Sequence, residues 1–579
     1  MKKHALYRLL SYISKYKGYM FASLIFALIS NVLIAFMPFV VGKAIDNIVA
    51  KNNVNFNDLM KIILILGIIY IVSAVFTWLF TTVANIVAYS TVKDLRNEAL
   101  EKINTLPLKY FDRNPHGDII SRLTNDMDNI SDGLFQGITQ FYPGIITILT
   151  SLILMLSLSI KLTIVIVLMT PLCFFIASFI TKRSNKMFKA QQKTLGELNG
   201  YTEEMIGNQK IVKLFGYEKR SEENFSKINA RLYKCGQLAQ FYSSITNPST
   251  RLVNNITYVL IGLVGGILAV LSRLSVGVIS SFLTYSTQFS QPINNITSVA
   301  TQLQAAFASC ERVFAILDEE PEKADSKDAE NMERCHGNVN FENVFFSYDK
   351  KVPLIEDFSA DIKQGSTVAI VGPTGAGKTT MVNLLMRFYD LDKGKITIDG
   401  REINKVTRNS LRNQFGMVLQ DTWLFEGTIR ENIAYGKPAA TLEEIKSAAK
   451  AAYIHSFIKR LPDGYDTMIT ESGGNLSEGQ KQLLTIARVM LINPPMLILD
   501  EATSSVDTRT EIKIQNAFLA MMKGRTSFVI AHRLSTIHDA EMILVMKNGH
   551  IVERGNHDEL IAKKGTYAKL YNSQFKYQG

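Results

Sequence analysis

The sequence TVAIV-GPTGAGKT at residues 367–379 decides the fold of the carboxyl-terminal half of the chain. Residues 367–371 form a short, continuous apolar run, which is typical of a buried strand in a parallel sheet. Residues 372–379 match the pattern GxxxxGK[ST], and a helical stretch follows. In this pattern backbone amides wrap the phosphates, Lys378 reaches the β- and γ-phosphates, and Thr379 ligates Mg²⁺. The stretch therefore predicts a P-loop domain that binds a nucleotide.

A second apolar run predicts the partner strand of this site. Residues 496–499 read MLIL and end in Asp500 and Glu501. An aspartate at the end of such a strand can hold the Mg²⁺ that bridges the phosphates. A carboxylate beside it can orient the attacking water or accept its proton. The pair predicts hydrolysis as well as binding.

Residues 475–480, NLSEGQ, precede a further helical stretch. Serine and glycine amides at a helix start form an anion site, although the chain already has its phosphate loop. Two phosphate-binding helix starts in one domain indicate that the second serves another nucleotide.

The amino-terminal half consists largely of apolar stretches. A membrane-spanning helix needs about 20 predominantly apolar residues. Six stretches qualify, the last being the weakest because of Gln288, Gln291, Asn294 and Asn295: they are Met20–Val41, Leu59–Ala84, Ile138–Ser159, Leu162–Thr181, Leu252–Leu271 and Val276–Val299. The whole-chain average of 47% hydrophobic residues hides this division.

The charges give the orientation of the predicted spans. Lys and Arg concentrate before the first span, between the second and third, and between the fourth and fifth. By the positive-inside rule these segments, the amino terminus and the carboxyl-terminal half are cytoplasmic. The net charge of +11 is thus mostly a topology signal, and nucleic acid is not an expected partner. The four cysteines lie far apart and indicate neither a disulfide framework nor a zinc site.

The two long cytoplasmic connections read as helices that continue from the membrane. Each has one break, at residues 114–118 and at residues 207–209, and the second predicted coupling loop extends to residue 216. We expect a transmembrane domain at 1–318, a charged linker at 319–336 and a nucleotide-binding domain at 337–579. The predicted fold is a six-helix all-α membrane domain with long intracellular extensions, followed by an α/β P-loop ATPase domain.

These motifs together resemble the half-transporters of the ATP-binding-cassette exporter family, of the multidrug and lipid type, over almost the full length. In the membrane half, residues 108–118 and 212–218 resemble the two intracellular loops that carry coupling helices. Residues 291–293 and 312–314 resemble the sixth helix and its exit. Asp507 matches the D-loop.

The resemblance, with the motifs above, implies a complete set of site residues. The catalytic candidates are Glu501, His532 and Lys378. The ATP-binding candidates are Tyr348, Gly372, Pro373, Thr374, Gly375, Ala376, Gly377, Lys378, Thr379, Thr380, Gln420, Ser477, Gly479 and Gln480. The Mg²⁺ ligands are Thr379, Gln420 and Asp500.

Three departures from the family pattern bear on the partner. The signature has Glu478 where the family has glycine, residues 470–473 read TESG where GERG is usual, and residues 482–484 read QLL. A carboxylate near bound phosphates adds a like charge. One cassette cannot complete its own ATP site, so two chains are needed. The departures favour a related heterologous chain as partner, and a second copy of this chain stays open.

The predicted function is ATP-driven export of amphipathic small molecules or lipids from the cytoplasm or inner leaflet, at a bacterial plasma membrane. Few ionisable residues interrupt the spans, which argues against ion coupling. Cavity candidates are the uncharged residues Asn31, Trp78, Gln140, Asn254, Asn255, Tyr285, Gln288 and Phe289. The alternatives are a lipid flippase, a peptide exporter, which the short stretch at 1–18 disfavours, and a nucleotide-gated channel. A fused membrane domain disfavours an importer, and six spans disfavour a soluble ATPase.

Overall fold

The computed structural model describes residues 2–48, 56–271, 274–373, 375–419, 422–470, 473–500, 507–530 and 537–575. The chain divides into two compact units. The first combines Met1–Leu106 with Asn114–Glu319, and the second combines Pro107–Arg113 with Glu320–Gly579.

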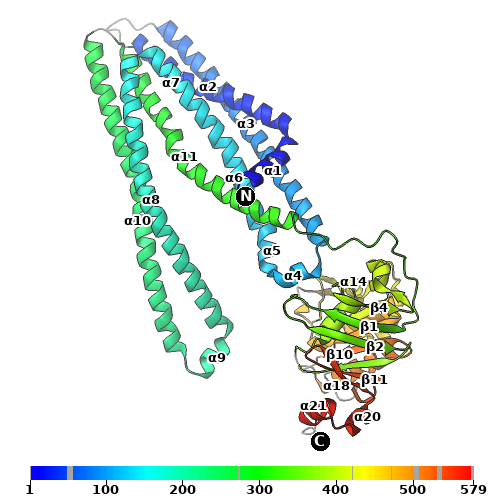
Figure 1. The fold of residues 1–579 in the computed structure, drawn as a ribbon. Helices are drawn as coiled ribbons and strands as arrows, with labels where there is room; N and C mark the ends of the chain where they lie inside the picture. Colours follow the sequence, from blue (N-terminus) through cyan, green and yellow to red (C-terminus); the bar gives the residue numbers. More distant parts are fainter. Residues whose placement is uncertain are drawn as a thin grey trace. The chain divides into compact units, whose positions relative to one another are not determined.

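The first unit is helical throughout its described residues (Figure 1). Its elements are α1 (Lys2–Ser14), α2 (Lys17–Ile48), α3 (Phe56–Asn104), α5 (His116–Leu123), α6 (Asn125–Gln136), the π-helix η1 (Gly137–Phe141), α7 (Tyr142–Leu158), α8 (Ile160–Gly207), α9 (Gln209–Leu214), α10 (Glu218–Val270) and α11 (Val276–Leu317).

Five segments of this unit are long and apolar enough to cross a membrane, counted over the described residues. They are Lys17–Ile48, Phe56–Asn104, His116–Leu158, Ile160–Gly207 and Glu218–Val270. They cover the first five predicted spans, except that the third and the fifth predicted spans extend one residue further, to Ser159 and Leu271. The sixth predicted span lies in α11, which is helical over 42 residues but carries the polar residues that made its prediction the weakest.

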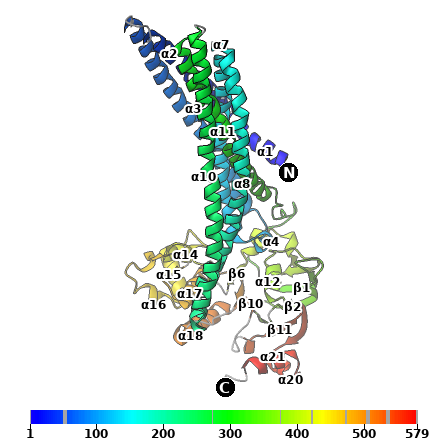
Figure 2. The ribbon, with the colours of Figure 1, turned by 90° about the vertical axis from the view of Figure 1, so that its left-hand side faces the viewer.

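The predicted extensions beyond the membrane are present as continuous helix. α8 and α10 have 48 and 53 residues, so at 1.5 Å per residue α10 is about 80 Å long, against about 30 Å for a bilayer core. Figures 1 and 2 both show the two helices side by side, with α9 at their far end. The predicted break at 207–209 is where α8 ends and α9 begins.

Hydrogen bonds join α2 to α11 near the predicted outer end of the spans. Asp46 accepts from the amide of Gly277 and from the hydroxyl of Ser275, both at 2.7 Å. The backbones approach closely here, because a Cβ on Gly277 would lie 2.0 Å from the carbonyl oxygen of Gly42. This end of the pair therefore depends on small residues and on one carboxylate.

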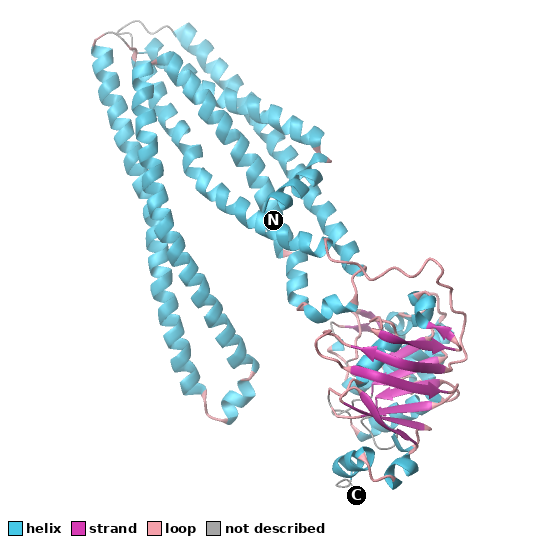
Figure 3. Cartoon of the chain, viewed as in Figure 1, coloured by secondary structure: helices cyan, strands magenta, loops and turns pink. Residues whose placement is uncertain are grey.

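The second unit contains every described strand (Figure 3). The strands are β1 (Val339–Phe346), β2 (Ile355–Ile362), β3 (Thr367–Val371), β4 (Lys393–Ile398), β5 (Arg401–Glu402), β6 (Phe415–Val418), β7 (Gly427–Thr428), β8 (Met468–Ile469), β9 (Met496–Asp500), β10 (Thr526–Ile530), β11 (Met542–Lys547) and β12 (His550–Gly555).

Helices cover the sheets of this unit. They are α4 (Leu108–Arg113), α12 (Lys378–Leu385), α13 (Arg408–Arg412), α14 (Ile429–Ala434), α15 (Leu442–Ala451), α16 (His455–Ile458), α17 (Glu478–Ile492), α18 (Thr508–Met522), α20 (His557–Ala562) and α21 (Thr566–Phe575), with 3₁₀ turns η2 (Ile403–Lys405) and η3 (Gly464–Asp466).

Two larger sheets form the frame. The first has the order β2-β1-β4-β5 and is antiparallel. The second has the order β12-β11-β3-β10-β9-β6 and is parallel except for β12. The buried faces of β3, β9, β10 and β11 explain why their sequences are nearly uninterrupted apolar runs.

The segment expected to be a linker packs on the second unit through charges. Asp325 binds two buried arginines, Arg408 at 2.8 Å and Arg387 at 3.3 Å. Glu322 binds Arg412 at 2.6 Å. Buried arginines need such partners. The acidic residues that predicted a linker therefore also hold this segment against the cassette.

Candidate functional site

The phosphate loop leaves the end of β3 and enters α12. Gly372 has no room for a side chain, because a Cβ there would lie 2.3 Å from the carbonyl oxygen of Met546 in β11. Gly377 has φ +97° and caps the start of α12, a conformation that favours glycine. The described residues of the loop therefore pack tightly against the sheet at Gly372 and enter α12 through Gly377.

Lys378 is the first residue of α12 and folds back over this loop. Its Nζ donates to the carbonyl oxygens of Gly372 at 2.7 Å and of Pro373 at 3.1 Å. Burial lowers the pKa of the Lys378 ammonium, and the charge of Asp500 opposes that shift. The cation is thus held at the mouth of the loop, within reach of a phosphate.

The strand register brings the predicted chemistry to one sheet edge. Ile530 of β10 pairs with Ile370 of β3 on one side and with Asp500 of β9 on the other. Val418 of β6 pairs with Leu499 of β9. Because these strands are parallel, their carboxyl ends meet beside the phosphate loop.

Several predicted site residues lie outside the described residues: Thr374, Gln420, Glu501 and His532. Their roles remain predictions. The described residues Thr379 and Thr380 lie in the first turn of α12, and Ala376 lies in the loop before it.

Tyr348 stands beside α12 in a chain of contacts that reaches α4. Its hydroxyl donates to Oγ1 of Thr380 at 3.2 Å. Its ring meets those of Phe346 and Tyr389 at centroid distances of 4.9 Å. The Tyr389 hydroxyl in turn donates to the carboxylate of Asp112 in α4. Burial raises the pKa of Tyr389, and the bond to Asp112 raises it further, so Tyr389 stays a donor at working pH.

The second predicted phosphate site is the start of α17. Ser477 is the N-cap, and its Oγ accepts from the amide of Gln480 at 3.4 Å, while Oε1 of Gln480 accepts from the amide of Ser477 at 3.0 Å. This capping box fixes the helix start. The Glu478 carboxylate is paired with the Lys481 ammonium at 2.8 Å, a contact that sequence reasoning did not anticipate.

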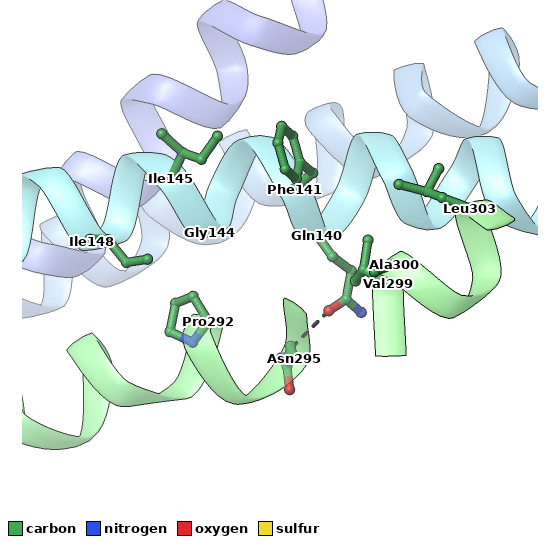
Figure 4. Close-up of a pocket in the computed structure, with 10 residues that line it drawn as sticks. All are labelled: Gln140, Phe141, Gly144, Ile145, Ile148, Pro292, Asn295, Val299, Ala300 and Leu303. Carbon is green, nitrogen blue, oxygen red and sulfur yellow. Dashed lines mark hydrogen bonds between the residues drawn. The ribbon is translucent and has the colours of Figure 1, made fainter. Parts of the chain in front are cut away.

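A cavity lies in the first unit between the third predicted span and α11 (Figure 4). It encloses about 120 Å³, and its lining is apolar apart from the carboxamides of Gln140 and Asn295. Nδ2 of Asn295 donates to Oε1 of Gln140 at 3.5 Å. The lining residues are Gln140, Phe141, Gly144, Ile145, Ile148, Pro292, Asn295, Val299, Ala300 and Leu303.

Of the eight uncharged cavity candidates, only Gln140 lines this cavity. Tyr285 is fully buried and donates to the carbonyl oxygen of Ala35 at 2.9 Å, and Phe289 packs in the same core as Tyr285. Asn31 accepts from the hydroxyl of Thr147, while Trp78 is 67% exposed on α3. Polar and aromatic residues in a span thus often serve helix packing.

A membrane-spanning unit fused to a P-loop unit, with two helix starts that the sequence predicts to bind phosphate, is the organisation expected of a membrane ATPase of the cassette type. Two family descriptions match: "ABC transporter transmembrane region" over residues 20–293 and "ABC transporter" over residues 355–504. The chain belongs to the ABC transporter family and is an integral membrane protein that couples ATP hydrolysis to transport.

Known proteins resemble the chain over nearly its full length. An uncharacterized ABC transporter ATP-binding protein, YfiC of Bacillus subtilis, is 42% identical over 99% of this chain and 95% of its own. A fatty acid ABC transporter ATP-binding/permease protein of Mycobacterium bovis is 44% identical over 90% of this chain and 83% of its own.

The solved structure of a bacterial Atm1-family ABC exporter with ATP bound has a TM-score of 0.75 and 30% identity, covering 96% of this chain and 98% of that one. The chain is therefore an exporter of this architecture, a class that works as a dimer.

Proposed function

We propose that this chain is one half of an exporter that moves amphipathic molecules with an uncharged polar head outward by alternating access, from the cytoplasm or the inner leaflet of a bacterial plasma membrane. The observation that carries the proposal is the cavity of Figure 4. Its apolar wall suits a hydrocarbon segment, and its two carboxamides suit a hydroxyl or amide head.

The geometry of the carboxamide pair supports this substrate class. At 3.5 Å the bond from Asn295 to Gln140 is at the long limit for a hydrogen bond, so little is lost when each amide turns to a ligand. Among the described side chains the lining contains no ionisable residue, and a carboxylate head brought here would lack a counter-charge from them. The volume of about 120 Å³ is small for a whole drug-sized ligand, so this is one subsite of a larger path.

ATP supplies the driving force in this proposal. Lys378 and the loop amides hold the phosphates, and Tyr348 stacks on the adenine. Magnesium would be held by the hydroxyl of Thr379, the carboxylate of Asp500 and the amide oxygen of Gln420, an oxygen set that suits this ion. Glu501 orients the attacking water, and His532 stabilises the charge on the γ-phosphate.

A second half-transporter completes the molecule, and we favour a related chain over a second copy. Two apolar side chains at the end of α9 support the need for a second chain, since Leu214 is 78% exposed and Phe215, the next residue, is 76% exposed in a segment predicted to be cytoplasmic. Exposed apolar groups of this size mark interaction sites. The altered signature around Glu478 favours a heterologous partner.

The substrate class is tested with ATPase stimulation in vesicles. The protein is reconstituted with whatever chain co-purifies, and matched amphiphiles of one chain length are added with a neutral glycerol head or a carboxylate head. We expect stimulation by the neutral compound, and its loss in Gln140→Leu and in Asn295→Leu. Gln237→Leu, which removes an exposed carboxamide of α10 outside the set of cavity candidates, is the matched control. Equal stimulation by the carboxylate, with Gln140→Leu unaffected, contradicts the proposal.

A second experiment tests both the identity of the partner chain and the catalytic role of Glu501. Glu501→Gln is introduced into the purified complex and turnover is measured. A complex of this chain alone that loses all turnover contradicts the heterologous partner. Unchanged turnover contradicts the role of Glu501. Substrate flux that continues without turnover favours a nucleotide-gated channel instead.

A further inference from the structure

Glu478 occupies the first turn of α17, in the segment that completes the partner's ATP site in the proposed function. An unpaired carboxylate at a helix start competes with phosphate for the same partial positive charge. It also repels the phosphates directly. Taken alone, the substitution of glutamate for the usual glycine predicts a weakened ATP site.

In the structure the Glu478 carboxylate forms an ion pair. Oε1 of Glu478 lies 2.8 Å from Nζ of Lys481, one turn further along α17. The bond draws the carboxylate along the flank of the helix, toward its interior turns. The Lys481 side chain is only 13% exposed, against 61% for Glu478, so the ammonium is the fixed member of the pair.

The aliphatic stem of Lys481 lies against Gly473. Gly473 has φ +68°, and a Cβ there would lie 3.0 Å from Cε of Lys481. A side chain at position 473 would therefore push against the stem of Lys481. Gly473 is the last residue of the segment TESG, at a position where the family pattern also has glycine.

We propose that Lys481 is a positioning residue for ATP binding: it neutralises Glu478 and holds it on the flank of α17, so that the helix start still accepts the phosphates of the ATP held by the partner's cassette. The inference rests on the proposed function, in which Ser477 and its neighbours face a nucleotide across a dimer. It deepens that function, because the altered signature then leaves the partner's ATP site able to bind.

The inference is tested by a double-mutant cycle in the purified complex. The probe is a fluorescent, non-hydrolysable analogue of Mg-ATP, which is titrated into the complex at low and at high salt. Lys481→Met keeps most of the stem and removes the charge, and we expect binding about fivefold weaker at low salt, the size of one uncompensated charge at a helix start. High salt should reduce the loss, since screening weakens exposed charges.

The second mutation separates charge compensation from structure. Glu478→Gln in the Lys481→Met background should restore binding to within about twofold of the wild type, and Glu478→Gln alone should bind as well or better. In turnover assays, Lys481→Met should raise the KM for ATP with little change in kcat, and Lys481→Arg should behave like the wild type.

Lys446→Met is the matched control, because Lys446 pairs with Glu443 at the same spacing and at 2.8 Å on α15. We expect no effect on nucleotide binding. Unchanged binding in Lys481→Met overturns the inference, as does a loss that Glu478→Gln leaves uncorrected, including loss through misfolding shown by a lowered melting temperature. Failure of the proposed function is distinct, because the purified complex would then contain a single cassette or show no stimulation of ATPase by the neutral amphiphile, and neither result depends on the charge of Lys481.

Discussion

The bond between Tyr389 and Asp112 gives a direct test of how the segment Pro107–Arg113 communicates with the nucleotide site. Asp112 lies in α4, and Tyr389 packs edge-on against Tyr348, whose hydroxyl binds Thr380 in α12. Tyr389→Phe removes only the hydroxyl. The ring keeps its contacts with Phe346 and Tyr348, so the aromatic cluster should remain intact.

The expected magnitude follows from the type of bond. A hydrogen bond to a charged group contributes about 1.5–3 kcal/mol when buried, and the exposure of Asp112 reduces this to about 1 kcal/mol. A change of this size in the docking of α4 corresponds to about a fivefold loss of coupling. We therefore expect substrate-stimulated ATPase to fall about fivefold in Tyr389→Phe, with basal ATPase within about twofold of the wild type.

A cycle with Asp112→Ala completes the test. Because both changes remove the same bond, the double variant should be no worse than either single variant. Tyr465→Phe serves as the control, since Tyr465 bonds His455 at 2.8 Å elsewhere in the cassette. Additive losses in the double variant, or the same loss in Tyr465→Phe, would refute the reasoning.

Three further predictions concern other parts of the molecule. Gly372→Ala places a methyl group against the carbonyl oxygen of Met546. ATP binding should therefore weaken at least about tenfold in equilibrium titration, and an unchanged affinity would show that the loop has room to shift. Asp46→Ala removes two hydrogen bonds to the start of α11, one of them to Gly277, and should lower the melting temperature in detergent by about 2–4 °C. An unchanged melting temperature would show that these bonds do not stabilise the contact between α2 and α11. Burial lowers the pKa of His557 from its ordinary 6.5, so the unfolded chain binds the proton more readily, and stability should fall as the pH drops through 6.5 toward the folded pKa. The protection factors of the amides in residues 557–575, which remove the intrinsic pH dependence of exchange, should therefore fall below about pH 6 in the wild type but not in His557→Phe. Protection factors that do not change with pH in the wild type would contradict the predicted direction.

Most of the fold could be predicted from the sequence, because its signals are local. A run such as residues 367–371 is apolar throughout, since both faces of β3 are buried. The spans are visible for the same reason, through the cost of placing polar groups in lipid. The phosphate loop was readable because Gly372 and Gly377 meet steric requirements that few other residues satisfy.

The contacts that tune the site were much less predictable. Asp112 and Tyr389 are 277 residues apart, so no local pattern joins them. Glu478 and Lys481 are three apart on a helix and were within reach of sequence reasoning, but the burial of Lys481 against Gly473 needed the structure. The role of a polar residue in a span was equally hard to predict: the hydroxyl of Tyr285 binds a carbonyl oxygen on α2, a partner that no local pattern in the sequence identifies.

The two internal hydrogen bonds of Lys378 affect how the affinity for a nucleotide should be understood. Because its ammonium already binds the carbonyls of Gly372 and Pro373, a phosphate does not meet a bare cation but displaces two internal acceptors. ATP binding is then an exchange of one set of bonds for another, and the measured affinity reports the difference between them.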